Sequence, residues 1–332
     1  MIEVLAERAG LGSRPGARTD AYRVALAIEG GGMRGTLSAG MALRIHELGL
    51  LHSVDAVYGA SAGAISAAWL ISSRPEGLRG WTDPRFAKAL IRKRNPLRGR
   101  PIVDVERLVE EVYLREFPLD YASVLASPLE LHPLATDVLS GAAVDLHPDL
   151  TDAATLRLAM RASAALPVLA GRPVAIGARR FYDAGLAESV PFRQALADEA
   201  THVLVLRSKS AQAIPPGPAT ASMGSRIIAG FALRGHTPQL RAAFLGRATR
   251  LADDERALAS YAVEAAATPL VGPAVLSIRP DPTAPTVNRL ETDSALLHAA
   301  FETGRHAVDT VLATGRPRRG GPSADARRRA DA

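Results

Sequence analysis

The sequence has no cysteine, few aromatic residues and no long apolar run. The lack of cysteine excludes disulfides, thiolate metal sites, iron–sulfur clusters and cysteine nucleophiles, and it favours a reducing compartment. No apolar run approaches the roughly 18 residues that a membrane-spanning helix needs. Glu3 and Glu7 stand where a signal peptide requires a basic start and an apolar stretch. We therefore expect a cytoplasmic protein.

Lysine is also scarce, since only Lys88, Lys93 and Lys209 stand among the 40 basic residues. The net charge of +6 is concentrated at the C-terminus, where residues 315–332 contain six arginines and two aspartates and so contribute +4. The rest of the chain is nearly balanced, which argues against a nucleic-acid-binding domain. We expect residues 315–332 to form a disordered basic tail, and residues 1–20, which lack apolar periodicity, to form a flexible leader.

Between these ends, short apolar runs alternate with stretches of helical periodicity. With 332 residues, 47% of them hydrophobic, the chain can bury a substantial core. We expect strands at residues 24–29, 54–58, 129–135, 174–176 and 201–206. We expect helices at residues 36–48, 62–71, 151–163 and 294–313, and within 225–266. This alternation predicts an α/β fold with a mainly parallel sheet covered by helices on both faces, in one domain over residues 21–314.

The segment Gly59-x-Ser61-x-Gly63 lies between an expected strand and an expected helix. This is the context of a nucleophile elbow, in which a sharp turn projects the serine hydroxyl above the sheet and small neighbours avoid collisions. The alternative is a tight turn in which Ser61 only caps the following helix.

A second glycine-rich turn, residues 30–35, also follows a strand and opens a helix. Gly30, Gly32 and Gly35 match a dinucleotide fingerprint, which requires an acidic residue at the carboxyl end of the next strand. Asp55 lies at the start of that strand instead. The other hypothesis is an oxyanion hole, in which backbone N–H groups turn toward a developing negative charge. This hypothesis explains both glycine-rich turns, because the ends of neighbouring parallel strands converge.

A serine nucleophile needs a base, and the sequence offers two candidates. Asp183 precedes Ala184-Gly185 in an expected tight turn, where a buried carboxylate can accept the serine proton. His202 would complete a triad in the chain order Ser61, Asp183, His202. None of the eight histidines lies in a glycine-rich loop. Asp183 alone is a weak base at its ordinary pKa near 4, so such a dyad depends on strong oxyanion stabilisation.

The turn at residues 30–35, the Ser61 motif and Asp183-Ala184-Gly185 together resemble the motifs of the patatin-like phospholipases. Segments 135–141, 161–167 and 287–293 are similar too, and the resemblance extends over residues 24–313. It implies a three-layer α/β/α fold and a lipid acyl hydrolase that works through an acyl-enzyme. Ser61 would be the nucleophile and Asp183 the general base.

The resemblance also implies an oxyanion hole built from the backbone of Gly31, Gly32 and Met33, with Ala62, and supported electrostatically by Arg34. It implies no cofactor and no metal, and the sequence contains no recognisable metal-ligand spacing. The family usually has glycine where this chain has Ala184. If that position requires a positive φ, alanine costs on the order of 1 kcal/mol.

The expected substrate is a lipid or another acyl ester. Three alternatives stay open: a non-lipid carboxylesterase or thioesterase with the same dyad, a nucleotide-binding protein, and a catalytically inactive regulatory protein. Residues 85–100 contain seven basic residues and no acidic one, namely Arg85, Lys88, Arg92, Lys93, Arg94, Arg98 and Arg100. This segment is either a peripheral docking site for an anionic membrane surface or a solvated helix face and loop.

Overall fold

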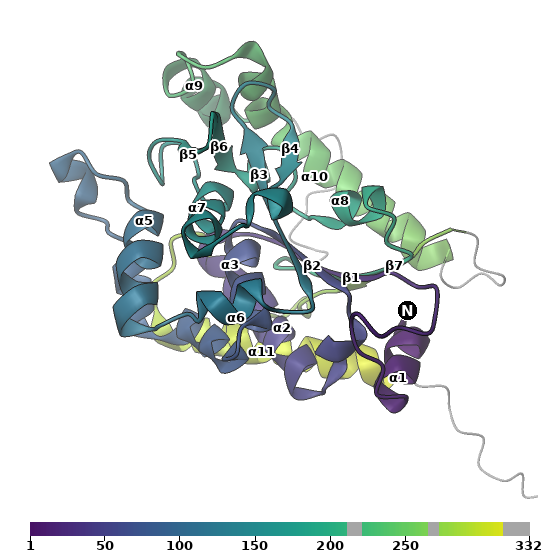
Figure 1. Ribbon diagram of the computed structural model, residues 1–332. Helices are drawn as coiled ribbons and strands as arrows, with labels where there is room; N and C mark the ends of the chain where they lie inside the picture. The colour runs from purple at the N-terminus through teal and green to yellow at the C-terminus, as the bar shows by residue number, and fades with distance from the viewer. Residues whose placement is uncertain (211–220, 265–271, 315–332) are drawn as a thin grey trace, which may run out of the picture.

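The computed structural model describes residues 1–210, 221–264 and 272–314 (Figure 1). Their strands form one sheet in the order β5-β6-β3-β2-β1-β7-β8, with β4 paired to β3. The pairs between β3, β2, β1, β7 and β8 are parallel, whereas β4, β5 and β6 pair antiparallel. The strands are β1 (Val24–Ile28), β2 (Ala56–Ala60), β3 (Glu130–Asp137), β4 (Ala143–Asp145), β5 (Val174–Ile176), β6 (Arg179–Asp183), β7 (His202–Leu206) and β8 (Ala274–Ile278).

The helices cover both faces of this sheet, which gives a three-layer α/β/α architecture. They are α1 (Ile2–Gly10), α2 (Thr36–Glu47), α3 (Ala62–Ile71), α4 (Pro84–Leu90), α5 (Val105–Arg107), α6 (Tyr121–Leu125), α7 (Ala153–Ser163), α8 (Phe192–Ala197), α9 (Met223–Phe231), α10 (Pro238–Glu264) and α11 (Ser294–Thr314). Short 3-10 turns occupy Gly32–Gly35 and Ala184–Leu186. The α/β prediction with a mainly parallel sheet is confirmed.

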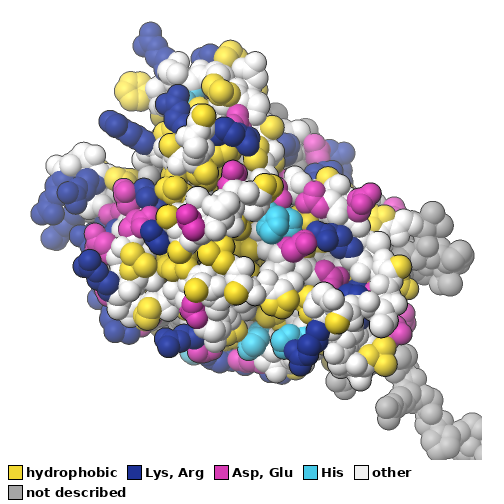
Figure 2. All heavy atoms as spheres, in the orientation of Figure 1, with side chains coloured by type: hydrophobic (Ala, Val, Ile, Leu, Met, Phe, Trp, Pro, Cys, Tyr) yellow, Lys and Arg dark blue, Asp and Glu magenta, His cyan; other side chains and the backbone are white. Residues whose placement is uncertain are grey.

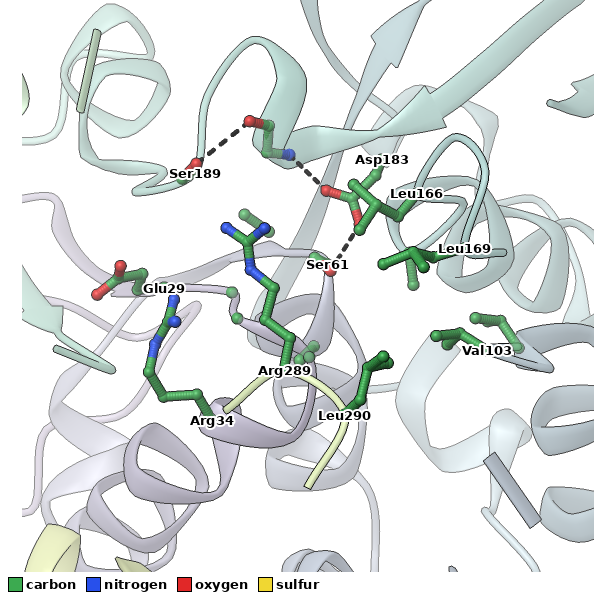
Figure 3. A pocket seen from close by; sticks show the side chains of 18 of the residues that line it. Glu29, Arg34, Ser61, Val103, Leu166, Leu169, Asp183, Ser189, Arg289 and Leu290 are labelled. Atoms are coloured by element: carbon green, nitrogen blue, oxygen red, sulfur yellow. Dashed lines mark hydrogen bonds between the residues drawn. The ribbon is translucent and has the colours of Figure 1, made fainter. Parts of the chain in front are cut away.

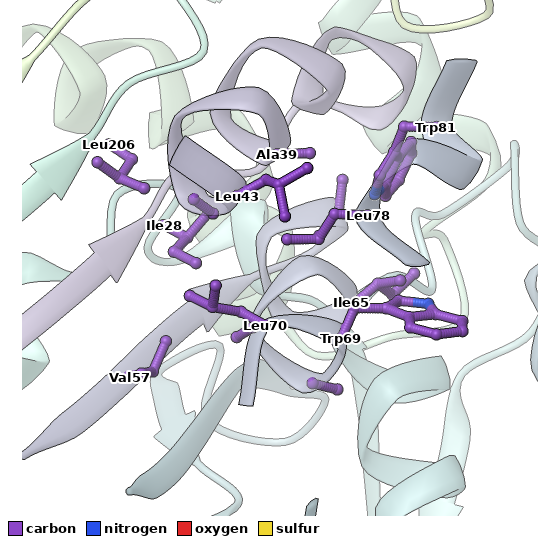
Figure 4. Close-up of a cluster of buried hydrophobic side chains, with 14 of the residues drawn as sticks. Ile28, Ala39, Leu43, Val57, Ile65, Trp69, Leu70, Leu78, Trp81 and Leu206 are labelled. Carbon is purple, nitrogen blue, oxygen red and sulfur yellow. The ribbon is translucent and has the colours of Figure 1, made fainter. Parts of the chain in front are cut away.

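The alternation of side chains along β1 explains the layers. Leu26 and Ile28 pack with α2, α3 and α11 on one face, whereas Ala25 and Ala27 pack with α8 and α10 on the other. Every residue of β1 is buried, as expected for a central parallel strand. Figure 4 shows the larger core, where Ile28 lies near Leu43 of α2. Burying each such side chain contributes about 1.5–3 kcal/mol.

Most expected elements are present. The helix expected at residues 62–71 and the strand expected at 174–176 are found with the same bounds. The strand expected at 54–58 is β2, which begins two residues later and ends two residues later. Strands β4, β6 and β8 have no counterpart among the expected elements. Among the described residues, no helix is both long and apolar enough to cross a membrane.

The flexible leader expected over residues 1–20 is wrong, because this segment forms α1 and packs against the domain. Arg8 is 2% exposed and joins Asp20 at 2.6 Å and Asp55 at 2.8 Å. Asp55 also accepts the backbone N–H of Val24 at 2.8 Å, so α1 is anchored at the start of β1. These ion pairs join residues far apart in the chain, and apolar periodicity does not reveal them. The basic tail expected at residues 315–332 lies outside the described residues.

Candidate active site

Ser61 lies in a sharp turn between β2 and α3. Its backbone has φ 55° and ψ −122°, in the left-handed region that non-glycine residues rarely adopt. The turn brings α3 close to the end of β1, because a Cβ added at Gly63 would lie 2.1 Å from the carbonyl oxygen of Ile28. Glycine is therefore required at position 63. The Oγ of Ser61 donates a hydrogen bond to Oδ2 of Asp183 at 2.7 Å.

Asp183 is the last residue of β6 and is 4% exposed. Its Oδ1 accepts the backbone N–H of Gly185 at 2.7 Å, and its carbonyl oxygen accepts the hydroxyl of Thr136 at 2.8 Å. Burial raises the pKa of Asp183, while the hydrogen bonds from Ser61 and Gly185 and the charge of Arg289 oppose this effect. The carboxylate is thus fixed in orientation and made more basic than a solvated aspartate.

Alanine at position 184 causes no backbone strain. In the described chain, the non-glycine residues with positive φ are Ser61, Val168 and Glu199. Ala184 begins the 3-10 turn after Asp183 with an ordinary backbone. Alanine at position 184, where the family usually has glycine, therefore does not incur the cost of about 1 kcal/mol that a positive φ would impose.

The two glycine-rich turns converge, as expected for neighbouring strands. Strands β1 and β2 pair in parallel, with Ile28 opposite Gly59. The turn after β1 then passes directly over the nucleophile turn, since a Cβ added at Gly30 would lie 2.9 Å from the Cβ of Ser61. This convergence favours the oxyanion hypothesis over the dinucleotide hypothesis, because β2 leads into Ser61 and not into an acidic residue.

The backbone N–H groups near Ser61 differ in availability. Within the described chain, those of Gly31, Gly32 and Ala62 donate to no protein acceptor. The N–H of Met33 instead donates to the carbonyl oxygen of Arg289 at 3.1 Å. The prediction that Met33 contributes an oxyanion donor is therefore wrong in this geometry. Sequence reasoning missed this bond because it depends on a segment more than 250 residues away.

Arg34 lies alongside the glycine-rich turn. Its Nε donates to the Oγ of Ser208 at 3.2 Å, and that hydroxyl donates to the carbonyl oxygen of Gly30 at 2.8 Å. A Cβ added at Gly31 would lie 3.0 Å from Nη2 of Arg34. Arg34 therefore contacts the glycine-rich turn through Ser208 and places a positive charge beside it.

His202 lies at the opposite end of the sheet from Ser61. It begins β7 and pairs with Val24 at the start of β1, whereas Ser61 follows the carboxyl end of β2. Burial lowers the pKa of His202 to about 4, so the imidazole is neutral at pH 7. The hypothesis of a triad with His202 is wrong, and Asp183 is the base candidate that the fold brings to Ser61.

Ser61 and Asp183 line a cavity of about 280 Å³. Figure 3 shows the pair between two different walls, with Glu29, Arg34 and Arg289 on one side and Val103, Leu166, Leu169 and Leu290 on the other. Trp81, Leu90, Ile91 and Val105 also line the cavity, as do Lys209 and Arg247. The apolar wall can accommodate an acyl chain, and the charged wall can accommodate a polar group.

Three potential metal ligands come together elsewhere. The ligand atoms of His132, Asp145 and Asp198 lie within 4.8 Å of one another. Each already has a protein partner, since His132 Nδ1 contacts Asp145 at 2.7 Å and Asp198 accepts the hydroxyl of Tyr58 at 3.0 Å. None of the three lines the cavity.

The basic segment 85–100 is partly buried. Phe86, Ala89 and Leu90 belong to the core, whereas Leu97 is 88% exposed. The basic side chains of residues 92–100 extend to one edge of the molecule, where Figure 2 shows Lys and Arg gathered. Arg85 and Lys88 are exposed as well, although Arg85 pairs with Asp83 at 2.8 Å.

Comparison with known proteins agrees with this geometry. Uncharacterized NTE family proteins of Mycobacterium bovis and Mycobacterium tuberculosis are 28% identical to the chain over 177 residues. Each match covers 51% of this chain and 44% of the relative, so the chain spans less than half the length of these relatives. A family model described as patatin-like phospholipase matches residues 26–196, which is more than half of the chain. The chain therefore belongs to the patatin-like phospholipase family.

Proposed function

We propose that this protein is a lipid acyl hydrolase of the phospholipase A or lysophospholipase type, with Ser61 as nucleophile and Asp183 as general base. The observation that carries the proposal is the 2.7 Å hydrogen bond from Ser61 Oγ to the buried Asp183, at a cavity with an apolar wall. Family membership supports the broader class, since patatin-like proteins are generally lipid hydrolases.

In the proposed first step, Ser61 Oγ attacks the ester carbonyl carbon and its proton passes to Asp183 Oδ2. The new C–O bond converts the carbonyl oxygen into an oxyanion. As this intermediate collapses, the bond to the leaving alcohol breaks and Asp183 returns the proton to the alcohol oxygen. Asp183 then activates a water that cleaves the acyl-enzyme. A buried carboxylate with a raised pKa suits this role, because its basicity is closer to the operating pH.

The N–H groups of Gly31, Gly32 and Ala62, which have no protein acceptor among the described residues, are the proposed oxyanion donors. They lie at the turns on either side of Ser61, and the N-terminus of α3 adds its positive end. A single such donor typically contributes about 2.7–4 kcal/mol to the transition state. The positive charge of Arg34, which lies beside the glycine-rich turn, would also stabilise the oxyanion.

The apolar wall is continuous with the basic segment. Leu90 and Ile91 precede its exposed tip, Val103 and Val105 follow it, and all four line the cavity. Basic residues near an anionic membrane surface each contribute about 1 kcal/mol of binding. We therefore place peripheral membrane contact at residues 92–100, next to the proposed path of the acyl chain.

The test is hydrolysis of p-nitrophenyl esters of increasing chain length and of the matched acyl thioesters. A lipid acyl hydrolase should prefer longer acyl chains and lose turnover in Ser61→Ala. Ser66→Ala is the matched control, because Ser66 is a buried serine of α3, the helix that follows Ser61. A preference for the shortest ester would favour a non-lipid carboxylesterase, and a preference for thioesters would favour a thioesterase.

A further inference from the structure

The glycine-rich turn after β1 needs support from outside itself. Gly30, Gly31 and Gly32 follow one another in it, and adjacent glycines lack the side-chain sterics that would keep the peptide between them in one orientation. A peptide group carries its C=O and the next N–H in one plane, where they point in opposite directions. The N–H of Gly31, a proposed oxyanion donor, therefore has a defined direction only if the carbonyl of Gly30 is fixed.

The hydroxyl of Ser208 fixes that carbonyl. Its Oγ donates to the carbonyl oxygen of Gly30 at 2.8 Å, and Ser208 is fully buried and does not line the cavity. A Cβ added at Gly31 would lie 3.1 Å from this Oγ, so the two residues are in close contact. Because the carbonyl oxygen of Gly30 points to Ser208, the N–H of Gly31 points away from it. Gly31 lines the cavity together with Ser61.

The register of the sheet brings Ser208 to the turn. Strands β1 and β7 pair in parallel, with Ile28 opposite Leu206. Gly30 and Ser208 each stand two residues further along the chain, and they keep the same separation of 178 positions. The contact therefore continues the pairing of two central strands beyond their carboxyl ends.

A buried carboxylate anchors Ser208. Its backbone N–H donates to Oε2 of Glu29 at 2.7 Å, and Nε of Arg207 donates to the same oxygen at 2.9 Å. Burial disfavours the charged form of Glu29, but the charges of Arg207 and Arg34 and these hydrogen bonds outweigh that effect and leave its pKa below the usual value. An ionised Glu29 thus fixes the backbone of Ser208 beside the turn.

Arg34 also binds the hydroxyl of Ser208. Its Nε donates to the Oγ at 3.2 Å, so a chain of hydrogen bonds leads from the guanidinium through the hydroxyl to the Gly30–Gly31 peptide. In such a chain each bond polarises the next, which makes the N–H at its end a stronger donor. Figure 3 shows Arg34 and Glu29 on the same side of Ser61. The charge of Arg34 can therefore act on the N–H of Gly31 through Ser208.

We propose that Ser208 is a positioning residue for the oxyanion site, which orients the N–H of Gly31 and transmits the charge of Arg34 to it. This inference rests on the proposed function, in which Gly31 stabilises the oxyanion. The oxyanion is present in the tetrahedral intermediate and its transition states, but not in the bound ester. Loss of the hydroxyl should therefore slow the chemical step and leave ester binding almost unchanged.

The test compares Ser208→Ala with Thr36→Val in the hydrolysis of p-nitrophenyl butyrate. Thr36 is the matched control, because it is fully buried and its Oγ1 donates to the carbonyl oxygen of Met33 at 2.7 Å in the same turn. The peptide of that carbonyl carries the N–H of Arg34, which is not a proposed oxyanion donor. Ser208→Ala should lower kcat by about tenfold to a hundredfold, with KM within about twofold of wild type. Thr36→Val should keep kcat within about twofold.

Two further measurements separate positioning from general stability. A trifluoromethyl ketone forms a tetrahedral adduct with a reactive serine, and its inhibition constant should rise in Ser208→Ala by about the factor by which kcat/KM falls. Arg34→Met should also lower kcat. The double variant should lose little more than Ser208→Ala alone, because Arg34 acts through Ser208.

A Ser208→Ala enzyme with the kcat and the ketone affinity of wild type would overturn the positioning role and leave the proposed function standing. Equal losses of kcat in Ser208→Ala and Thr36→Val would show a general weakening of the turn and also overturn it. Additive losses for Arg34 and Ser208 would overturn the transmission of charge. A Ser208→Ala protein without a thermal unfolding transition would assign the hydroxyl to stability and overturn the positioning role. A folded wild-type protein that neither hydrolyses the ester nor reacts with a fluorophosphonate would overturn both proposals.

Discussion

The backbone N–H of Ser61 donates to the Oγ of Ser163 at 2.9 Å, across 102 positions of the chain. Ser163 ends α7 and is fully buried, so its hydroxyl is held by the surrounding core. The bond fixes the backbone of a residue whose φ of 55° is intrinsically unfavourable. Ser163 is therefore a positioning residue for Ser61, and it does not itself contact the expected path of the reacting ester.

Replacing Ser163 with alanine should lower kcat by about tenfold to a hundredfold while Ser61 and Asp183 remain. The Ser61 N–H would lose its acceptor, and a buried unsatisfied donor costs about 1–3 kcal/mol. Ser66→Ala is again the control, since the hydroxyl of Ser66 is buried without a hydrogen-bond partner in the described chain. Ester hydrolysis and thermal unfolding of both variants check this. A Ser163→Ala enzyme with the activity of wild type would contradict the positioning role.

Asp183→Asn should reduce kcat/KM by about a hundredfold to ten-thousandfold, the usual contribution of a general base. The amide keeps the shape of the side chain but does not accept the proton of Ser61. In wild type, the proton acceptor is available only when Asp183 is ionised. Activity should therefore fall as the pH drops through the raised pKa of Asp183, above the value of 3.8 for a free aspartate. A pH profile of kcat/KM measures this fall in activity. If the same fall persisted in Asp183→Asn, Asp183 would not be the general base.

The same substitution should stabilise the fold at neutral pH. Because burial raises the pKa of Asp183, the native state binds a proton more tightly than the unfolded state does. The stability that this group contributes is present at low pH and is lost as the pH rises through the raised pKa. Asparagine removes the buried charge, so Asp183→Asn should melt at a higher temperature than wild type at pH 8. A lower melting temperature would show that the carboxylate is better compensated than its burial indicates.

Glu188 makes stability depend on pH outside the dyad. Burial raises its pKa to about 7, so its contribution is present below pH 4.5 and is lost as the pH rises through 7. This change corresponds to about 3 kcal/mol between the two ends of the range. Glu188→Gln should therefore remove much of the loss of stability between pH 5 and pH 8. Urea unfolding at both pH values measures it, with Glu7→Gln, an exposed glutamate of α1, as control.

Arg94→Gln/Arg98→Gln should weaken binding to vesicles that contain anionic lipid. Each of these exposed arginines contributes about 1 kcal/mol near such a surface, so the double variant should bind about 30-fold more weakly. Arg14→Gln/Arg74→Gln removes the same charge from exposed positions outside segment 85–100. Vesicle co-sedimentation compares the two. Equal loss in both variants would mean that overall charge, and not residues 92–100, directs the contact.

Local sequence was sufficient for the elements that bear the nucleophile. Ser61 lies in a tight turn after the apolar strand β2, and Asp183 follows Phe181 and Tyr182 and precedes a short turn, so both patterns are visible in adjacent residues, although strand β6 itself was not expected. The convergence of the two glycine-rich turns followed from the parallel pairing of consecutive strands, a general property of α/β folds.

What the sequence did not reveal depends on contacts between distant segments. Met33 is a plausible oxyanion donor until the chain returns and the carbonyl of Arg289 takes its N–H. Likewise, helix α1 is held by the ion pair of Arg8 with Asp55, 47 positions away. The contact of Ser208 with Gly30 also forms only in the folded chain, since the two residues lie 178 positions apart and Ser208 belongs to no motif of the nucleophile or base. Such pairings are set by tertiary structure and not by local propensity.

The most direct test of the central claim is labelling of the purified protein with a fluorophosphonate, followed by mass-spectrometric mapping of the modified peptide. The probe requires only an activated serine and no knowledge of the substrate. We predict one adduct, on Ser61, that is absent in Ser61→Ala and strongly reduced in Asp183→Asn. A folded protein that stays unmodified at Ser61, both alone and with anionic lipid vesicles present, would contradict the proposed Ser61–Asp183 mechanism.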